Sequence, residues 1–66
     1  MNIKVNGSQT DIEATTLAEL VVLLGYEKDA KIATALNGDF IPASKRQEQR
    51  LHDHDEVEIV APRQGG

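Results

Sequence analysis

One amphipathic segment, residues 16–25, most strongly limits what this chain can fold into. Its apolar residues recur at the helical spacing i, i+3, i+4 and i+7: Leu17, Leu20, Val21 and Leu24. Thr16 and Glu19 have the spacing of a capping box, in which each side chain satisfies a free backbone N–H at the start of a helix. Gly25 stands where a left-handed C-terminal cap is expected. Two more apolar residues lie outside the stripe, and the sequence leaves their burial open: Val22 and Leu23.

Two Asn-Gly pairs predict tight hairpin turns, because the central residues of such turns need φ > 0. Asn6-Gly7 precedes the expected helix and Asn37-Gly38 follows it. Alternating or short apolar runs predict strands over residues 1–5, 9–13, 32–36, 39–41 and 56–60. Pro42 ends the fourth strand or confines it to an edge, since proline cannot donate a ladder hydrogen bond.

The order of these elements predicts an α+β fold of the β-grasp (ubiquitin-like) type, with a mixed sheet of about five strands packed on one main helix. The last strand has enough chain before it to cross over and pair in parallel beside the first. Ser44 is expected to cap a short helical turn over residues 45–49. We expect one β-grasp domain over residues 1–60, followed by a flexible C-terminal tail over residues 61–66.

Length, cysteine content and charge exclude several classes of protein. A chain of 66 residues forms one small domain, on which a deep catalytic pocket is hard to build. The absence of cysteine excludes disulfides and thiol nucleophiles, and it suits a reducing cytoplasm. A net charge of −4 disfavours nucleic-acid binding, and Lys45, Arg46 and Arg50 form the single expected basic cluster. The longest apolar run is five residues, so we expect neither a membrane span nor export.

The turn that contains His52 and His54 has two interpretations, a metal site or a solvated turn. Two histidines at i, i+2 on an irregular turn do not converge easily, and zinc needs three or four well-placed ligands. We therefore expect no metal site here. The preferred interpretation is a turn in which Asp53 or Asp55 accepts hydrogen bonds from backbone N–H groups.

The last residues, 61–66, are expected to form a thread that enters the active site of a partner. Gly65 and Gly66 carry no Cβ, so a terminal carboxylate behind them passes through a narrow opening without a clash. The alternative is a frayed terminus, which is common in any domain. Glu56 and Glu58 share one face of the preceding strand, and we expect them to form an outward acidic stripe that steers docking to a basic partner.

Together these features resemble the small sulfur carrier proteins of thiamine biosynthesis, over essentially the whole chain. The resemblance is carried by Val5-Asn6-Gly7, Thr16-Leu17-Ala18-Glu19-Leu20, Ala35-Leu36-Asn37-Gly38-Asp39-Phe40-Ile41-Pro42, residues 53–60 and Gln64-Gly65-Gly66. Two departures from the family pattern stand out. His54 takes the place of a usual glycine in the closing turn. The family often has arginine straight after the proline and an aromatic residue soon after, whereas here Ala43 follows Pro42, and Lys45 and Arg46 come later.

The resemblance implies a carrier cycle centred on Gly66. A partner adenylating enzyme, similar to ubiquitin-activating enzymes, would activate the Gly66 carboxylate with ATP. A sulfur donor, such as a cysteine desulfurase system, would then leave a thiocarboxylate, and a thiazole synthase would take the sulfur. ATP and metal belong to the partner, because the sequence lacks a Gly-rich phosphate-binding loop. The chain is thus expected to bind no cofactor itself and to be a co-substrate, not an enzyme.

Four other tail residues are expected to contact the partner: Pro62, Arg63, Gln64 and Gly65. Pro62 restricts φ and so lowers the cost of ordering the thread on docking. Arg63 either pairs with an acidic group or a phosphate at the partner's entrance or is solvated. Two other classes stay open. One is the small subunit of molybdopterin synthase, which usually has an aromatic-rich closing strand, and the other is a non-conjugating β-grasp binding module.

Overall fold

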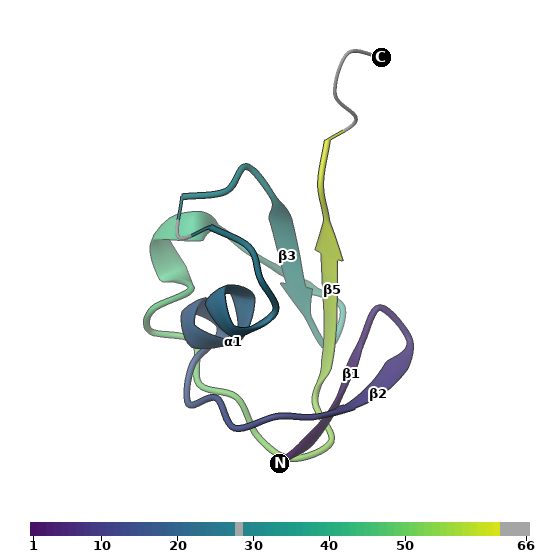
Figure 1. The fold of residues 1–66 in the computed structure, drawn as a ribbon. Coiled ribbons are helices and arrows are strands. Elements are labelled where there is room, and N and C mark those ends of the chain that lie inside the picture. Colours follow the sequence, from purple (N-terminus) through teal and green to yellow (C-terminus); the bar gives the residue numbers. More distant parts are fainter. Residues whose placement is uncertain (28, 63–66) are drawn as a thin grey trace.

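The computed structural model describes residues 1–27 and 29–62, which form a five-stranded sheet beside one α-helix (Figure 1). The elements are β1 (Asn2–Val5), β2 (Ser8–Asp11), α1 (Leu17–Leu23), β3 (Ala33–Leu36), β4 (Asp39–Ile41), the short 3-10 helix η1 (Ala43–Lys45) and β5 (Glu56–Val60). The strand order in the sheet is β2-β1-β5-β3-β4. β5 therefore lies at the centre, parallel to β1 and antiparallel to β3. The predicted β-grasp fold is confirmed.

The helix α1 has the caps that its sequence predicts. The Thr16 hydroxyl accepts a hydrogen bond from the Glu19 N–H at 3.2 Å. The Glu19 carboxylate accepts one from the Thr15 N–H at 2.8 Å, one residue before the expected position. At the other end Gly25 adopts a φ of 102°, and the chain closes with the two hydrogen bonds of a Schellman motif. No helix among the described residues is long and apolar enough to cross a membrane.

The hydrophobic core lies between α1 and the face of the sheet that the helix covers (Figure 1). Its buried residues are Ile3, Ala14, Leu17, Leu20, Val21, Leu36, Leu51, Val57 and Ile59. Three residues of the predicted helical stripe belong to it, and Leu24 packs half-buried against it. Val22 and Leu23 do not, since their side chains are 52% and 55% exposed. The alternation of side chains along a strand explains further core residues. Val57 and Ile59 face inward, and their neighbours on β5 face outward.

The two Asn-Gly turns bind β5 through their asparagine side chains. Asn6 and Asn37 have the predicted left-handed conformation, with φ of 50° and 51°. Asn6 Nδ2 donates to the Ile59 carbonyl at 3.1 Å, and its Oδ1 accepts from the Ile59 N–H at 2.8 Å. Asn37 Oδ1 accepts from the Glu56 N–H at 2.9 Å, while its Nδ2 donates to the Asp55 carboxylate at 3.0 Å. β5 is therefore held at its start by one turn and near its end by the other.

The predicted short helix after β4 begins earlier than expected, and its predicted cap is wrong. The structure has η1 over Ala43–Lys45, which includes Ser44. The chain then continues into a turn closed by a hydrogen bond from the Gln49 N–H to the Lys45 carbonyl at 3.0 Å. Pro42 occupies the cap position with a φ of −65°, and no side-chain hydrogen bond caps the element. The fixed φ of proline, not a serine hydroxyl, starts the turn.

Arg46, which follows η1, is a buried residue. It is only 7% exposed, and its guanidinium points toward β3. Nε donates to the Thr34 hydroxyl at 3.0 Å and Nη2 to the Ile32 carbonyl at 2.6 Å. The prediction that Arg46 forms a surface cluster with Lys45 and Arg50 is therefore wrong, because its charge is turned into the fold.

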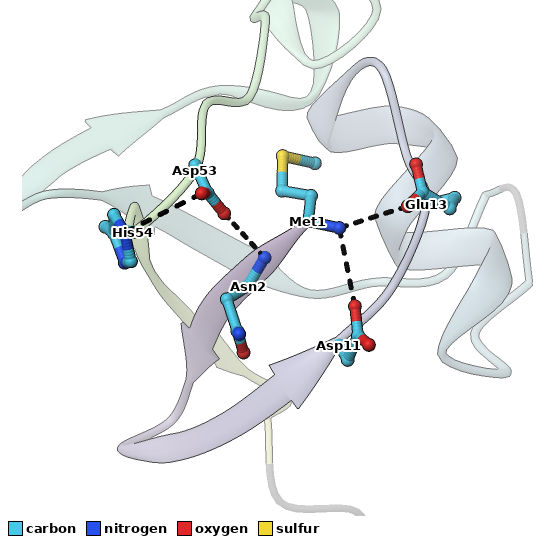
Figure 2. Close-up of polar contacts among 6 residues, drawn as sticks. All are labelled: Met1, Asn2, Asp11, Glu13, Asp53 and His54. Atoms are coloured by element: carbon cyan, nitrogen blue, oxygen red, sulfur yellow. Dashed lines mark hydrogen bonds and ion pairs between the residues drawn. The ribbon is translucent and has the colours of Figure 1, made fainter.

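The first residues are bound to the segments on both sides of them (Figure 2). The Met1 amine donates to the Glu13 carboxylate at 3.0 Å and to Asp11 at 3.4 Å. The hydrogen bond to Glu13, followed by that to Asp11, raises the pKa of the Met1 amine above its ordinary value. The His54 N–H donates to the Asn2 carbonyl at 2.6 Å. The start of β1 is thus hydrogen-bonded to the end of β2, to the residues that follow it and to the turn before β5.

Replacement of Asn6 tests how much its side chain contributes to stability. Asn6→Ala removes both bonds to Ile59 at a φ of 50°, so we expect a loss of about 2–4 kcal/mol in the free energy of unfolding. Asn6→Gly removes the same amide but tolerates that φ, and we expect a smaller loss of about 1–2 kcal/mol. Urea denaturation measures both losses, and hydrogen exchange of the Ile59 N–H should accelerate in both variants. Parent-like stability and exchange in Asn6→Gly would contradict this role.

His54 occupies a backbone conformation that glycine adopts more readily, with a φ of 72°. Its imidazole lies 3.6 Å from the Asp53 carboxylate, but both side chains are largely exposed, so this pair contributes little. We expect His54→Gly to raise the free energy of unfolding by about 0.5–1 kcal/mol through relief of strain. His54→Ala is the matched control, since it removes the imidazole and keeps the strain. Thermal denaturation in which the alanine variant gains as much as the glycine variant would exclude backbone strain as the cause.

Candidate functional site

The candidate site lies where β5 leaves the sheet. The chain continues beyond Val60 away from the other strands (Figure 1), and Pro62, one of the predicted contact residues, is exposed there. The other predicted site residues lie outside the described residues: Arg63, Gln64, Gly65 and Gly66. The described part of the site is therefore the end of β5, which leads to these residues, and the surface around it.

The face of the sheet opposite α1 carries two large exposed apolar side chains next to this exit. Phe40 on β4 is 68% exposed and Val60 on β5 is 64% exposed. The register places Ala35 opposite Phe40 and Ala33 opposite Val60. Because directly opposed residues have neighbouring Cβ atoms, these four residues form one continuous surface. We call Ala33, Ala35, Phe40 and Val60 the outer apolar patch.

A shallow hollow joins the outer apolar patch to the base of the tail. It is lined by Lys31, Ile32, Ala33, Val60, Ala61 and Pro62. The lining is mostly apolar, with the exposed Lys31 at its rim. Ala33 and Val60 belong to both the hollow and the patch, so the apolar surface continues to the base of the tail.

The predicted acidic stripe is present on the same face. Glu56 and Glu58 are both exposed, on the side of β5 that faces away from the core. Lys4 is registered with Glu56 across the β1–β5 pair, so one cation lies beside the stripe. Glu58 is registered with Ala35, next to the outer apolar patch. The face thus combines an apolar centre with a carboxylate at its edge.

The histidine turn has the backbone hydrogen bonds expected of a turn. The Asp55 carboxylate accepts from the His52 N–H at 2.8 Å, and Asp53 accepts from the Asn2 N–H at 2.7 Å, as Figure 2 shows for Asp53. Both aspartates therefore fill the predicted role. The two histidines pair with separate carboxylates, His52 with Asp55 at 3.9 Å and His54 with Asp53 at 3.6 Å. No three His, Cys, Asp or Glu side chains within residues 1–27 and 29–62 are placed to hold a metal ion.

The fold and this site define the chain as a small ubiquitin-like β-grasp domain whose central strand leads out of the sheet beside an exposed apolar face. The model of the ThiS family matches residues 3–66. The chain therefore belongs to the ThiS family, the sulfur carrier proteins of thiamine biosynthesis, whose members carry sulfur and are not catalysts.

Two solved structures support the same assignment. The crystal structure of the thiamine biosynthesis protein ThiS from Geobacter metallireducens is 25% identical, with a TM-score of 0.84 and full coverage of both chains. The solution structure of a thiamine biosynthesis protein from the same organism is also 25% identical, with a TM-score of 0.82 over 100% of this chain and 88% of that chain. No curated protein sequence matches the chain at a significant level.

The sequence interpretation missed the outer apolar patch. It identified the acidic stripe by period two but assigned no role to Phe40 or Val60. The signal was nevertheless present, since a two-residue turn at Asn37-Gly38 pairs Leu36 with Asp39 and hence Ala35 with Phe40. Combined with an inward Leu36, that pairing places Phe40 on the outer face.

Proposed function

We propose that the Gly66 carboxylate is the group on which this protein carries sulfur. A partner adenylating enzyme joins the carboxylate to AMP from ATP and releases pyrophosphate. A sulfur donor then attacks the acyl carbon, AMP leaves, and a thiocarboxylate results, which passes its sulfur to a thiazole synthase. The observation that supports this cycle best is the family match, which extends through the last residue of the chain.

The chemistry requires a partner because a carboxylate is a poor electrophile. Its negative charge repels nucleophiles, so one oxygen must first become part of a leaving group, which ATP provides. The chain contains no Gly-rich phosphate-binding loop, so we assign ATP to the adenylating enzyme. Reduced sulfur survives best in a reducing compartment, and we therefore propose a cytoplasmic location.

The arrangement around β5 suits a protein that presents its terminus to others. β5 is paired with a neighbour on each side, and its last residues are also bound by Asn6. The base of the tail is thus fixed to the domain. Pro62 has a fixed φ, which limits the conformations of the unbound tail and so reduces the entropy that is lost on docking.

We further propose that the outer apolar patch docks on the adenylating enzyme and on the thiazole synthase in turn. Exposed aromatic side chains surrounded by smaller contacts are typical centres of protein interfaces. Because both enzymes would use the same patch beside the same tail, their complexes exclude each other. The carrier must then dissociate from the first enzyme before the second takes the sulfur.

Mass spectrometry of the intact protein tests the carrier cycle. After incubation with ATP, a ThiS-type adenylating enzyme and a sulfur donor, we expect the mass change of one oxygen replaced by sulfur, located at Gly66 by fragmentation. Deletion of Gly66 should abolish the change, while circular dichroism shows an intact fold. The cycle would be refuted by an unchanged mass with an adenylating enzyme that modifies the Geobacter relative.

Substitution of Phe40 tests the docking surface separately. We expect Phe40→Gln to weaken binding to the adenylating enzyme roughly tenfold or more, because one large apolar side chain is no longer buried in the complex. Its stability should change little, since Phe40 is 68% exposed. Leu23→Gln is the matched control on the helix side and should bind like the parent. If isothermal titration finds the same affinity for Phe40→Gln, Leu23→Gln and the parent, the outer apolar patch is not the docking surface.

A further inference from the structure

The exposed large apolar side chains of the described residues fall into two pairs on opposite faces. Phe40 and Val60 lie on the outer face of the sheet, whereas Val22 and Leu23 lie on the solvent side of α1. The solvent side of a surface helix is usually polar, and the core stripe of α1 does not need these two residues. The second pair therefore lies outside both the buried core and the hollow at the base of the tail.

Val22 and Leu23 border a groove of about 960 Å³ between α1, residues 29–30 and the η1 region. Figure 1 shows η1 and the loop after α1 beside the helix. Small side chains line the groove where these segments meet: Ala18, Ala30 and Ala43. Because these positions have only a Cβ, the neighbouring segments leave a hollow that larger residues would fill. The volume lies in the range of sites that bind ligands and peptide segments.

The wall of the groove on the η1 side is fixed by hydrogen bonds to the helix and the sheet. Arg46, a lining residue, is held by the Thr34 hydroxyl and the Ile32 carbonyl. The Ala18 N–H donates to the Arg46 carbonyl at 3.1 Å, and the Leu17 N–H donates to the Gln49 carbonyl at 2.9 Å. The groove is thus formed before any partner arrives, which lowers the entropic cost of binding.

Among the described residues, three of the four charged side chains that line the groove are acidic. Glu13 and Glu19 lie at the end near the start of α1, and Asp29 lies on the loop that follows the helix. Arg46 directs its Nε and Nη2 donors into the fold. The Met1 amine forms an ion pair with Glu13 at 3.0 Å, so the acidic character of the groove comes mainly from Glu19 and Asp29. The whole chain carries a net charge of −4. An apolar floor with acidic ends is complementary to a segment that carries apolar side chains between lysines or arginines.

We propose that this groove is a second docking site, which binds an amphipathic basic segment of a partner protein. Apolar side chains of that segment lie on Val22, Leu23 and the three alanines, and its cations lie against Glu19 and Asp29. Helix-in-groove recognition of this kind is common among peptide-binding domains. Since α1 covers the face of the sheet opposite the outer apolar patch, a partner in the groove and an enzyme on the patch bind at the same time. The proposal does not depend on the chemistry at Gly66.

A designed peptide is the first probe of the groove. We choose an amphipathic Leu-Lys peptide about 15 residues long, near the length at which a helix becomes stable, and a control in which every lysine is glutamate. In ¹H–¹⁵N correlation spectra of the full chain, the Leu-Lys peptide should cause saturable shifts at Ala18, Val22, Leu23 and Ala43. The control peptide should cause none. Shifts centred on β4 and β5, no saturable shifts, or equal binding of the control peptide would each overturn the proposal.

Variants on the two faces then separate this groove from the tail site. The double substitution Val22→Gln and Leu23→Gln should weaken the Leu-Lys peptide roughly tenfold or more, and it should fold, because both side chains are half exposed. Phe40→Gln should leave the affinity unchanged. Asp29→Lys should weaken the Leu-Lys peptide and permit binding of the control peptide. If both the double variant and Asp29→Lys bind the Leu-Lys peptide with the affinity of the parent, the groove is not its binding site.

Discussion

Much of the molecule depends on how the central strand is held along its two edges. β5 has neighbours on both sides, but the β1 ladder ends before the last residues of β5. The Asn6 side chain replaces the missing backbone there and binds both polar groups of Ile59. At the first residue of β5, the Asn37 side chain accepts from the Glu56 N–H, and the Asn37 backbone N–H donates to the Glu56 carbonyl. Asparagine thus meets two requirements at each position. It adopts the left-handed backbone of the turn, and its side chain binds the backbone of β5, whereas glycine would meet only the first requirement.

Local patterns were sufficient to predict most of the fold, because each element has its own signal. The helix caps, the two Asn-Gly turns and the alternation in β5 all depend on residues close together in sequence. The missed features depend on long-range packing. Ser44 has a capping side chain, yet Pro42 and the path of the chain toward α1 decide where η1 begins. Within the site, the outward acidic stripe was predictable from period two, whereas the outer apolar patch required the register of three strands at once.

Arg46 and Thr34 show why a charged residue escaped the sequence interpretation. They are the buried polar residues among those described, at 7% and 1% exposure, and they are hydrogen-bonded to each other. The Thr34 hydroxyl also donates to the Ile41 carbonyl at 2.9 Å, which joins β3 to β4. Removal of the Arg46 side chain would leave the Thr34 hydroxyl without this donor. Arg46 in turn donates to the Thr34 hydroxyl and the Ile32 carbonyl, so loss of either residue of the pair leaves a buried polar group without its partner.

The same buried pair links the two faces of the domain. Arg46 forms a wall of the groove beside α1, and through Thr34 it is bonded to the strand whose outward residues, Ala33 and Ala35, belong to the outer apolar patch. Both surfaces therefore contain residues that belong to β3 or are hydrogen-bonded to it. In a domain of 66 residues there is little core to separate two binding surfaces. A shared layer fixed by hydrogen bonds would let each proposed surface bind its partner without reshaping the other, as the proposed exchange of enzymes on the outer apolar patch requires.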